Sequence, residues 1–303
     1  MTASRNTPND KPRRDLHAEI TGRLIAAIEA DPGTPQMPWR RASTPLWMPL
    51  NAVSQNAYSG INVVNLWVAA EVRGFSSPHW ATFKQWRGAG CQVRKGAKAE
   101  LVIFYKEYDV EPSADDDNDD GKRRVARASH VFNAAEVDGF SAPDAPLMLG
   151  PIERIEAADR FIGATRARIE HGGDRAFYRP TSDHIQMPDE GLFTGTDTMT
   201  RDESYFAVLL HELTHWTMHK DRCDRQLDKR FGKQAYAAEE LVAEIGSAML
   251  CAEIGVTQDT RPDHAQYIAN WLQLLKDDPK AIFTAAARAS EAVAYLKRLQ
   301  PTP

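Results

Sequence analysis

Residues 205–219, YFAVLLHELTHWTMH, are the most informative segment of this 303-residue sequence. The apolar residues around its centre predict a buried helix, on which His211 and His215, four residues apart, share one face. Glu212 follows directly after the first histidine. Because two histidines and a glutamate on a buried helix need partners, the segment predicts a divalent metal site. Glu212 is then placed to take a proton from a water molecule activated by the metal.

A catalytic zinc site needs a third protein ligand and one open position, and a second apolar helix offers that ligand. Residues 234–254 are expected to form this helix, with Glu240 and Glu244 on one face and Glu239 turned away by ~100°. We predict that Glu240 is the third ligand and that Glu244 holds a ligand histidine by its other nitrogen. The alternative, in which these glutamates lie on a helix surface, stays open.

Composition places the chain among ordinary soluble globular proteins. Hydrophobic residues make up 42% and charged residues 26% of the sequence. No apolar run approaches the ~18–20 residues of a membrane-spanning helix, and the first fifteen residues lack the apolar core of a secretory signal. The three cysteines form no CxxC pair, which argues against a disulfide framework and against a cysteine-based zinc site. We therefore expect a cytoplasmic protein with no membrane partner.

The charges are unevenly distributed along the chain. Residues 1–110 carry 14 Lys and Arg against 9 Asp and Glu, whereas residues 111–303 carry 23 against 33. Five of the seven tryptophans also fall within residues 39–86, among basic residues. Aromatic faces and a track of cations are what single-stranded DNA requires, whereas an ordinary mixed core is the alternative explanation. The candidate DNA contacts are Trp39, Arg40, Arg41, Tyr58, Trp80, Lys84, Trp86, Arg87, Arg94, Lys95 and Lys98; Trp47, Trp67 and Phe104 are expected in the core.

Hydrophobic periodicity and turn signals predict an α+β fold in both halves, with helices dominating the second. The expected domains are residues 1–140, which would bind DNA, and residues 152–303, joined by the proline-containing linker 141–151. Helices are expected at about 15–30, 62–73, 82–87, 152–170, 202–219, 234–254, 263–276 and 279–298, and strands at about 100–110, 124–133, 175–179 and 184–187. The acidic run DDDNDDG between the first two strands is expected to be a solvated hairpin tip.

Several blocks of the sequence, in order, resemble the ArdC-type antirestriction proteins of conjugative plasmids, which are related to the N-terminal region of TraC-type primases. They are NAYSGINVVNLW (56–67), SPHWATFKQW (77–86), GCQVRKGAKAELVIF (90–104), FYRPTSDHIQMP (177–188), YFAVLLHELTHWTMH (205–219) and FGKQAYAAEELVAEIGSAMLCAEIG (231–255). The blocks extend over nearly the whole chain. The DDDNDD run belongs to none of them.

The resemblance implies a single-stranded-DNA-binding domain followed by a zincin-type metallopeptidase domain. His211, His215 and Glu240 correspond to the metal ligands and Glu212 to the general base, with zinc as the expected metal and manganese as the alternative. The implied function is protection of incoming plasmid DNA from restriction during conjugation. Two other functions stay open: a DNA-binding protein whose metal site is structural, and an intracellular metallopeptidase that cleaves DNA-associated proteins and uses DNA only for targeting.

Overall fold

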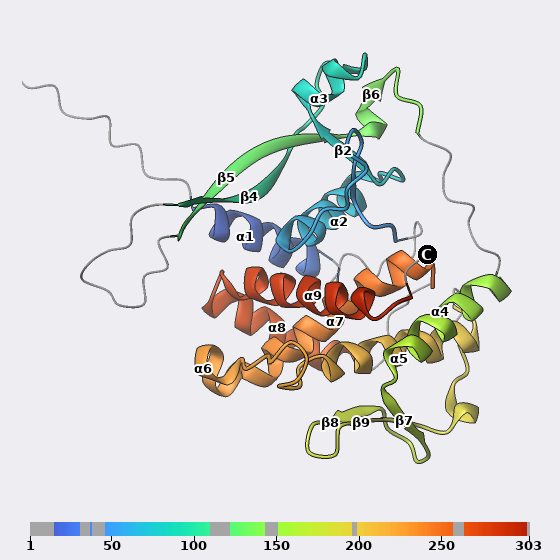
Figure 1. Ribbon diagram of the computed structural model, residues 1–303. Coiled ribbons are helices and arrows are strands. Elements are labelled where there is room, and N and C mark those ends of the chain that lie inside the picture. The colour runs from blue at the N-terminus through green and yellow to red at the C-terminus, as the bar shows by residue number, and fades with distance from the viewer. Residues whose placement is uncertain are drawn as a thin grey trace, which may run out of the picture.

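A long, curved β-ribbon crosses one end of the molecule, helices fill its middle and a small sheet lies at the other end (Figure 1). The computed structural model describes residues 15–30, 37, 46–109, 122–142, 151–195, 199–256 and 264–301. The acidic run and most of the expected linker lie outside these ranges. Within them, an α+β N-terminal part is followed by a mostly helical part with a small sheet, which confirms the predicted fold class.

The N-terminal part is built on a mixed sheet with the strand order β1-β2-β5-β4, in which β1 and β2 are parallel and the other pairs antiparallel. A separate pair joins β3 to β6. The elements are α1 (Leu16–Glu29), β1 (Leu50–Asn51), α2 (Ile61–Arg73), β2 (His79–Thr82), α3 (Phe83–Gly88), β3 (Gln92–Val93), β4 (Glu100–Asp109), β5 (Lys122–Asn133) and β6 (Val137–Asp138).

Helix α2 closes the free edge of this sheet through two buried amides. The side chain of Asn62 both accepts a hydrogen bond from the Ile103 N–H (2.7 Å) and donates one to the Ile103 carbonyl (2.8 Å). Asn65 donates to the carbonyl of Leu101 (2.7 Å). These amides satisfy backbone groups that an exposed edge strand would offer to another chain.

The C-terminal part consists of helices and one small sheet with the order β7-β9-β8. Its elements are α4 (Pro151–Thr165), β7 (Arg168–His171), β8 (Phe177–Arg179), β9 (His184–Met187), α5 (Arg201–Trp216), α6 (Asp228–Phe231), α7 (Ala235–Ile254), α8 (His264–Asp277) and α9 (Ala281–Arg298). Helix α4 is shorter than predicted. It ends at Thr165, because Arg166 has a left-handed φ of 57° and the next residues pair in parallel with β9.

The two predicted domains share one hydrophobic core. The largest cluster of buried apolar residues continues from α1 and α2, through β4, to α7, α8 and α9. Hydrogen bonds join the same elements: Gly60 N–H donates to the Ser290 hydroxyl (2.8 Å) and the Thr21 hydroxyl to the Pro279 carbonyl (2.6 Å). Helix α9 therefore packs against both halves of the chain.

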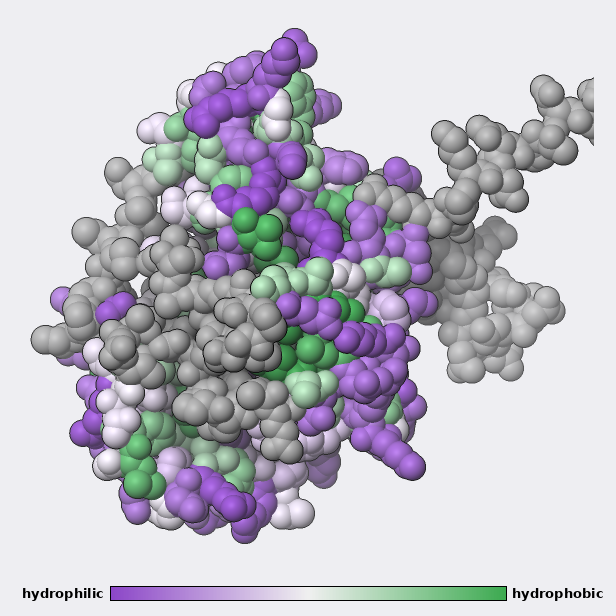
Figure 2. Space-filling model, turned by 180° about the vertical axis from the view of Figure 1, so that it is seen from behind, coloured by the Kyte–Doolittle hydropathy of each residue, from purple (hydrophilic) through white to green (hydrophobic). Residues whose placement is uncertain are grey.

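The face seen in Figure 2 is largely hydrophilic, with hydrophobic side chains in separate groups. No helix in the described part of the chain is long and apolar enough to cross a membrane.

Candidate metal centre

Helix α5 carries the HELTH segment and is fixed at its N-terminus by a capping box. The Thr200 hydroxyl accepts a hydrogen bond from the Glu203 N–H (3.2 Å), and the Glu203 carboxylate accepts one from the Thr200 N–H (3.0 Å). The same carboxylate pairs with Arg154 of α4 (3.2 Å). From Phe206 to Trp216 every residue of the helix is buried. The surrounding side chains therefore hold the helix, and with it the two histidines, in the interior of the protein.

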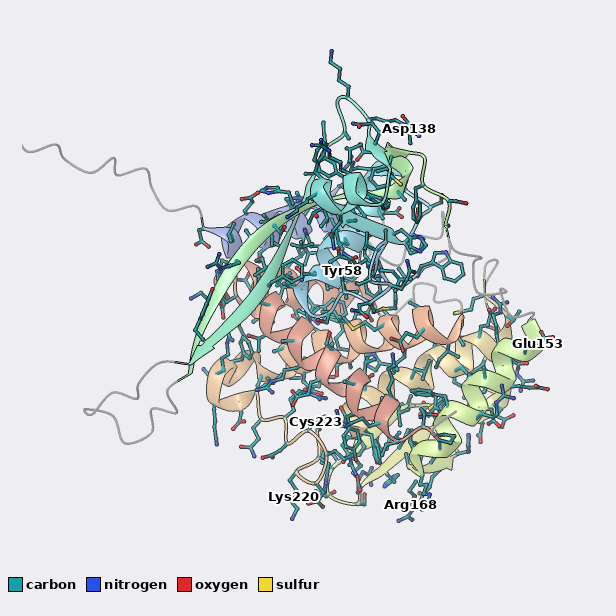
Figure 3. All side chains as sticks on the ribbon, turned by 45° about the horizontal axis from the view of Figure 1, so that its top comes forward. Tyr58, Asp138, Glu153, Arg168, Lys220 and Cys223 are labelled. Carbon is teal, nitrogen blue, oxygen red and sulfur yellow. The ribbon has the colours of Figure 1, made fainter. Side chains whose placement is uncertain are left out.

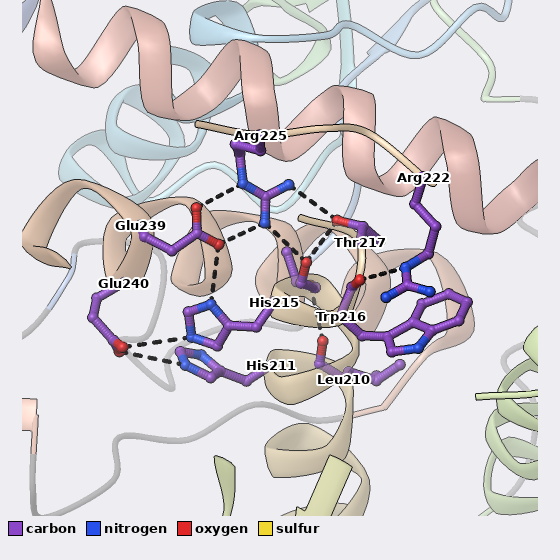
Figure 4. A network of polar contacts seen from close by, with 10 residues as sticks. Leu210, His211, His215, Trp216, Thr217, Arg222, Arg225, Glu239 and Glu240 are labelled. Atoms are coloured by element: carbon purple, nitrogen blue, oxygen red, sulfur yellow. Dashed lines mark hydrogen bonds and ion pairs between the residues drawn. The ribbon is translucent and has the colours of Figure 1, made fainter. Parts of the chain in front are cut away.

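Three of the predicted site residues meet at one point. The Glu240 carboxylate of α7 lies 3.6 Å from Nε2 of His211 and 3.5 Å from Nε2 of His215 (Figure 4). One ligand atom from each of the three residues can be chosen so that all lie within 4.8 Å of one another. Ligands ~2.0–2.2 Å from a zinc ion stand roughly 3.3–3.6 Å apart in a tetrahedron. The donor set and its spacing therefore fit a divalent metal ion.

Glu239 supplies the carboxylate beside the second ring nitrogen of His215. The sequence had suggested this role for Glu244. Nδ1 of His215 lies 3.1 Å from Glu239. Glu239 is turned away from Glu240, and this turn takes it to the opposite nitrogen of the same ring. Glu244 lies further along α7 and is fully buried; its predicted contact with a ligand histidine stays a prediction.

Arg225, which sequence reasoning missed, neutralises Glu239. Its guanidinium donates two hydrogen bonds of 2.6 Å to that carboxylate, one to the Thr217 hydroxyl (3.0 Å) and one to the Thr214 carbonyl (3.1 Å) (Figure 4). Only 3% of Arg225 is exposed. A buried carboxylate without such a partner would be costly, so the arginine keeps Glu239 ionised and in place. No motif marks Arg225, because it lies beyond the end of α5.

The protonation of the metal-free site follows from these contacts. Burial lowers the pKa of His215, but the carboxylates of Glu239 and Glu240 outweigh burial and raise that pKa to about 10. Burial raises the pKa of Glu240, but its two histidine neighbours outweigh burial and bring it below the ordinary range. Without metal, His215 therefore carries a proton at neutral pH, and a metal ion and that proton compete for the same imidazole.

The site opens into a cleft of about 650 Å³. Glu212 lines it together with the two histidines and Glu240. Phe177 and Tyr178 of β8, an edge strand that contacts α5, also line the cleft. Tyr236, one turn before Glu240 on α7, also lines the cleft, and its hydroxyl lies 3.3 Å from that of Tyr267. The cleft thus offers space, a general-base candidate and an edge strand beside the three candidate ligands.

The predicted DNA contacts are not all where the sequence placed them. Trp80 and Trp86 are 1% and 0% exposed, which excludes them as stacking surfaces in this conformation. Trp80 packs edge-on against Phe75, and Trp86 packs against Phe140 and donates to the Phe132 carbonyl (3.1 Å). Each ring fills a core position on or beside β2, so the prediction for these two tryptophans is wrong.

All of the predicted cations that the structure describes are on the surface. Lys84, Arg87, Lys95 and Lys98 are exposed, and exposed Arg94 pairs with Asp138 (2.7 Å) at the outer end of the N-terminal part (Figure 3). Tyr58 is 7% exposed and lies towards the helical half. Trp39, Arg40 and Arg41 lie outside the described residues. Which of these exposed cations contact DNA stays a prediction.

One aromatic residue was predicted in the core but lies on the surface. Phe104 of β4 is 47% exposed, and Phe83 at the start of α3 is 48% exposed. Trp67, in contrast, is 4% exposed, and its indole N–H donates to the Trp47 carbonyl (2.8 Å). An apolar run in an edge strand does not show where the elements that cover the sheet end. The exposure of Phe104 could therefore not be predicted from sequence.

A helix bearing HExxH, packed beside a small sheet and facing a glutamate from a second helix, defines a zincin-like metallopeptidase domain. A family model for zincin-like metallopeptidases matches residues 156–288, and one for the N-terminal domain of the anti-restriction factor ArdC matches residues 14–132. The chain belongs to the ArdC family of antirestriction proteins.

Similarity to solved structures and curated proteins extends over nearly the whole chain. The crystal structure of the antirestriction protein ArdC from plasmid R388, in its metal-free form, is 38% identical with a TM-score of 0.75 over 95% of this chain and 98% of that one. Its Mn(II)-bound form gives a TM-score of 0.74 over 95% and 99%. Protein y4eC of Sinorhizobium fredii is 42% identical over 94% of this chain and 92% of its own length.

A DNA primase TraC of Escherichia coli is also related. It is 35% identical over 302 residues, which cover 92% of this chain but only 27% of the primase. The shared region is therefore a minor part of the primase.

Proposed function

We propose that this protein binds single-stranded DNA and protects incoming plasmid DNA from restriction during conjugation, and that its second domain is a metal-dependent peptidase. Membership of the ArdC family, together with an intact HExxH helix facing Glu240, is the observation that carries this proposal. We place the DNA-binding domain at residues 1–140, the linker at 141–151 and the peptidase domain at 152–303. The two family matches fall on either side of that linker.

His211, His215 and Glu240 would hold the metal, for which we propose zinc, with manganese as the alternative suggested by the related Mn(II)-bound structure. Such an ion would lower the pKa of a water molecule to ~7 and polarise a substrate carbonyl. Glu212 lines the cleft beside the two histidines and would take the proton of the attacking water. Glu239 and Arg225 would keep His215 oriented throughout.

Two alternatives use the same residues differently. In one, the metal site is structural and DNA binding alone provides protection. In the other, the protein is an intracellular metallopeptidase that cleaves DNA-associated proteins, and DNA only targets it. Glu212 argues against a purely structural site, because a site that only holds a metal has no use for a carboxylate in the position of a base.

The variant Glu212→Gln separates these functions. We expect it to keep metal content, measured by mass spectrometry, and affinity for an oligonucleotide, because Glu212 is not among the three candidate ligands. Cleavage, including self-cleavage stimulated by single-stranded DNA, should fall by about 10²–10⁴, the usual loss of a general base. Plasmid transfer into a restricting recipient should remain protected if covering the DNA suffices.

The control is Lys95→Glu, an exposed change on the N-terminal part that should weaken DNA binding and leave the cleavage measured without DNA unchanged. Loss of protection in Glu212→Gln at unchanged DNA affinity would favour the peptidase alternative. Unchanged cleavage in Glu212→Gln would show that the site is not a peptidase of this mechanism.

A further inference from the structure

A second and larger cleft lies between the N-terminal sheet and helix α9. Its volume is about 1310 Å³, above the ~300–1,000 Å³ of ordinary small-molecule sites. The loop around Tyr58, the side chains of Thr82 and Gln85, and strand β4 form one side; Lys280 and residues of α9 form the other. Tyr58 lies in this region between the two halves (Figure 3). We call it the inter-half cleft.

The charged groups that line the inter-half cleft are all positive. Arg230, Lys280 and Arg288 line it, and no carboxylate is among its described lining residues. Two of these cations make exposed ion pairs, Arg230 with Asp278 (3.1 Å) and Arg288 with Glu291 (2.7 Å). Exposed ion pairs contribute little to stability, so a phosphate can take the place of the carboxylate. All three cations come from the half of the chain that is acidic overall.

An aromatic surface leads out of the same cleft along the β-ribbon. Phe104 lines the cleft, and its direct partner on β5 is Arg127, so both side chains lie on one face of the sheet. Arg127 is exposed and donates a hydrogen bond to the Tyr108 hydroxyl (2.9 Å). An exposed ring beside a cation and a half-buried tyrosine on one sheet face suits unstacked bases, which stack on aromatic rings.

The remaining polar lining favours a single strand over a duplex. The amides of Asn51, Asn56 and Gln85 face the cleft and can donate to or accept from base edges. A ring such as Phe104 stacks only on a base whose own face is free, and in a duplex those faces are covered by neighbouring bases. The cleft therefore combines phosphate partners, a stacking ring and hydrogen-bonding groups.

We propose that single-stranded DNA runs through the inter-half cleft, with Arg288 and Lys280 on its phosphates and Phe104 stacked on a base. This inference rests on the proposed DNA-binding function and deepens it, because it makes the C-terminal half part of the DNA site. It also brings the strand beside helix α6, whose Arg230 lines this cleft and whose Asp228 lines the metal cleft. DNA would thus lie within one short helix of the peptidase site.

The test uses the full chain and a fluorescein-labelled oligothymidine, with affinity measured by fluorescence anisotropy. Arg288→Glu should weaken binding at least about tenfold, whereas Arg298→Glu, an exposed arginine of the same helix outside the cleft, should change it less than about twofold. Phe104→Ala should weaken binding at least about fivefold, the lower limit for one stacked base. Phe83→Ala, an equally exposed ring outside the cleft, is its control. Arg288→Gln replaces the reversal variant if that variant is poorly folded.

The outcomes distinguish the two proposals. If the wild type binds the oligonucleotide and the cleft variants match their controls, the inter-half cleft is not the site, but the proposed function stands. If the wild type shows no preference for the oligonucleotide over a duplex, both proposals fail. If poly-glutamate displaces the oligonucleotide at equal charge concentration, the cleft is a site for acidic protein segments and the DNA assignment is overturned.

Discussion

At the scale of single residues, the metal centre depends on largely buried charges that neutralise one another at the wall of the cleft. His215 contacts Glu240 on one side of its ring and Glu239 on the other, and Arg225 completes the group. All four are at most 9% exposed. Removing one member of such a group leaves a buried charge without its partner, which costs more than the pair itself contributes. The two neighbouring glutamates therefore have different tasks that substitution can separate.

We predict that Glu240→Gln loses the metal, whereas Glu239→Gln retains it with an affinity reduced by about 10–100-fold. The first variant removes a ligand oxygen, and the second only weakens the support of a ligand histidine. Metal content after dialysis and titration of the metal-free protein measure both. Equal retention in the two variants, or a greater loss in Glu239→Gln, would show that the third ligand is misassigned.

A second residue-scale prediction concerns acid stability and His79 of β2. Burial lowers the pKa of His79 below its ordinary value of 6.5, so the folded protein keeps this imidazole neutral. Below pH 6.5 the imidazole of His79 binds a proton more readily in the unfolded chain than in the folded chain. The free energy of unfolding therefore decreases as the pH falls. The free energy of unfolding should decrease by at most about 1.4 kcal/mol per pH unit from this group. His79→Gln should unfold with a shallower pH dependence between pH 7 and pH 5 in denaturant titrations; an unchanged dependence would contradict it.

At the scale of elements, the metal centre depends on how closely α5 and α7 approach. Gly246 of α7 faces Thr214 of α5, and a Cβ at this glycine would lie 2.6 Å from the threonine Cγ2. Thr214 is fully buried and its hydroxyl donates to the Leu210 carbonyl (2.8 Å), so the branched side chain has little freedom to move. The small residue lets the two helices meet closely enough for Glu240 to reach both histidines.

Gly246→Ala should therefore push α5 and α7 apart. We expect a loss of about 1–3 kcal/mol in the free energy of unfolding and a weaker metal affinity. Gly22→Ala is the matched control: it lies in α1, nothing stands within 4 Å of an added Cβ, and it should stabilise the protein by about 0.5–1 kcal/mol. Unchanged metal affinity in Gly246→Ala would mean that the helix spacing does not control the site.

At the scale of the whole molecule, the N-terminal sheet does not stand alone. The apolar faces of α1 and α2 are covered in part by α8 and α9, and Lys276 and Glu29 form an ion pair across the same contact (2.7 Å). A fragment of residues 1–140 would expose the surface that faces these helices. It would also lack the cations that α9 and Lys280 contribute to the inter-half cleft.

We therefore predict that the full chain unfolds in one cooperative transition. The calorimetric and van't Hoff enthalpies should agree, because one core connects the two parts. A fragment of residues 1–140 should show no cooperative transition of its own. Two separate transitions in the full chain, one of them retained by the fragment, would show that the parts fold independently.

The sequence by itself determined the candidate metal ligands and most of the elements. A spacing of four residues puts His211 and His215 on one face of any α-helix, and Glu240 and Glu244 likewise, because helix geometry is local. The apolar periodicity predicted the long helices and the paired strands β4 and β5 for the same reason. Such features need no knowledge of what packs against them.

Only the tertiary structure decided what depends on contacts between distant segments. Arg225 reaches Glu239 from a loop. Strand β7 takes the place of the end of a predicted helix, because it pairs with β9. The ring of Trp86 packs against that of Phe140. Phe104 emerges from the core because the cover of the sheet stops beside it. Burial and ion pairing are properties of neighbours in space, and a local pattern cannot reveal neighbours that lie tens of residues away in the chain.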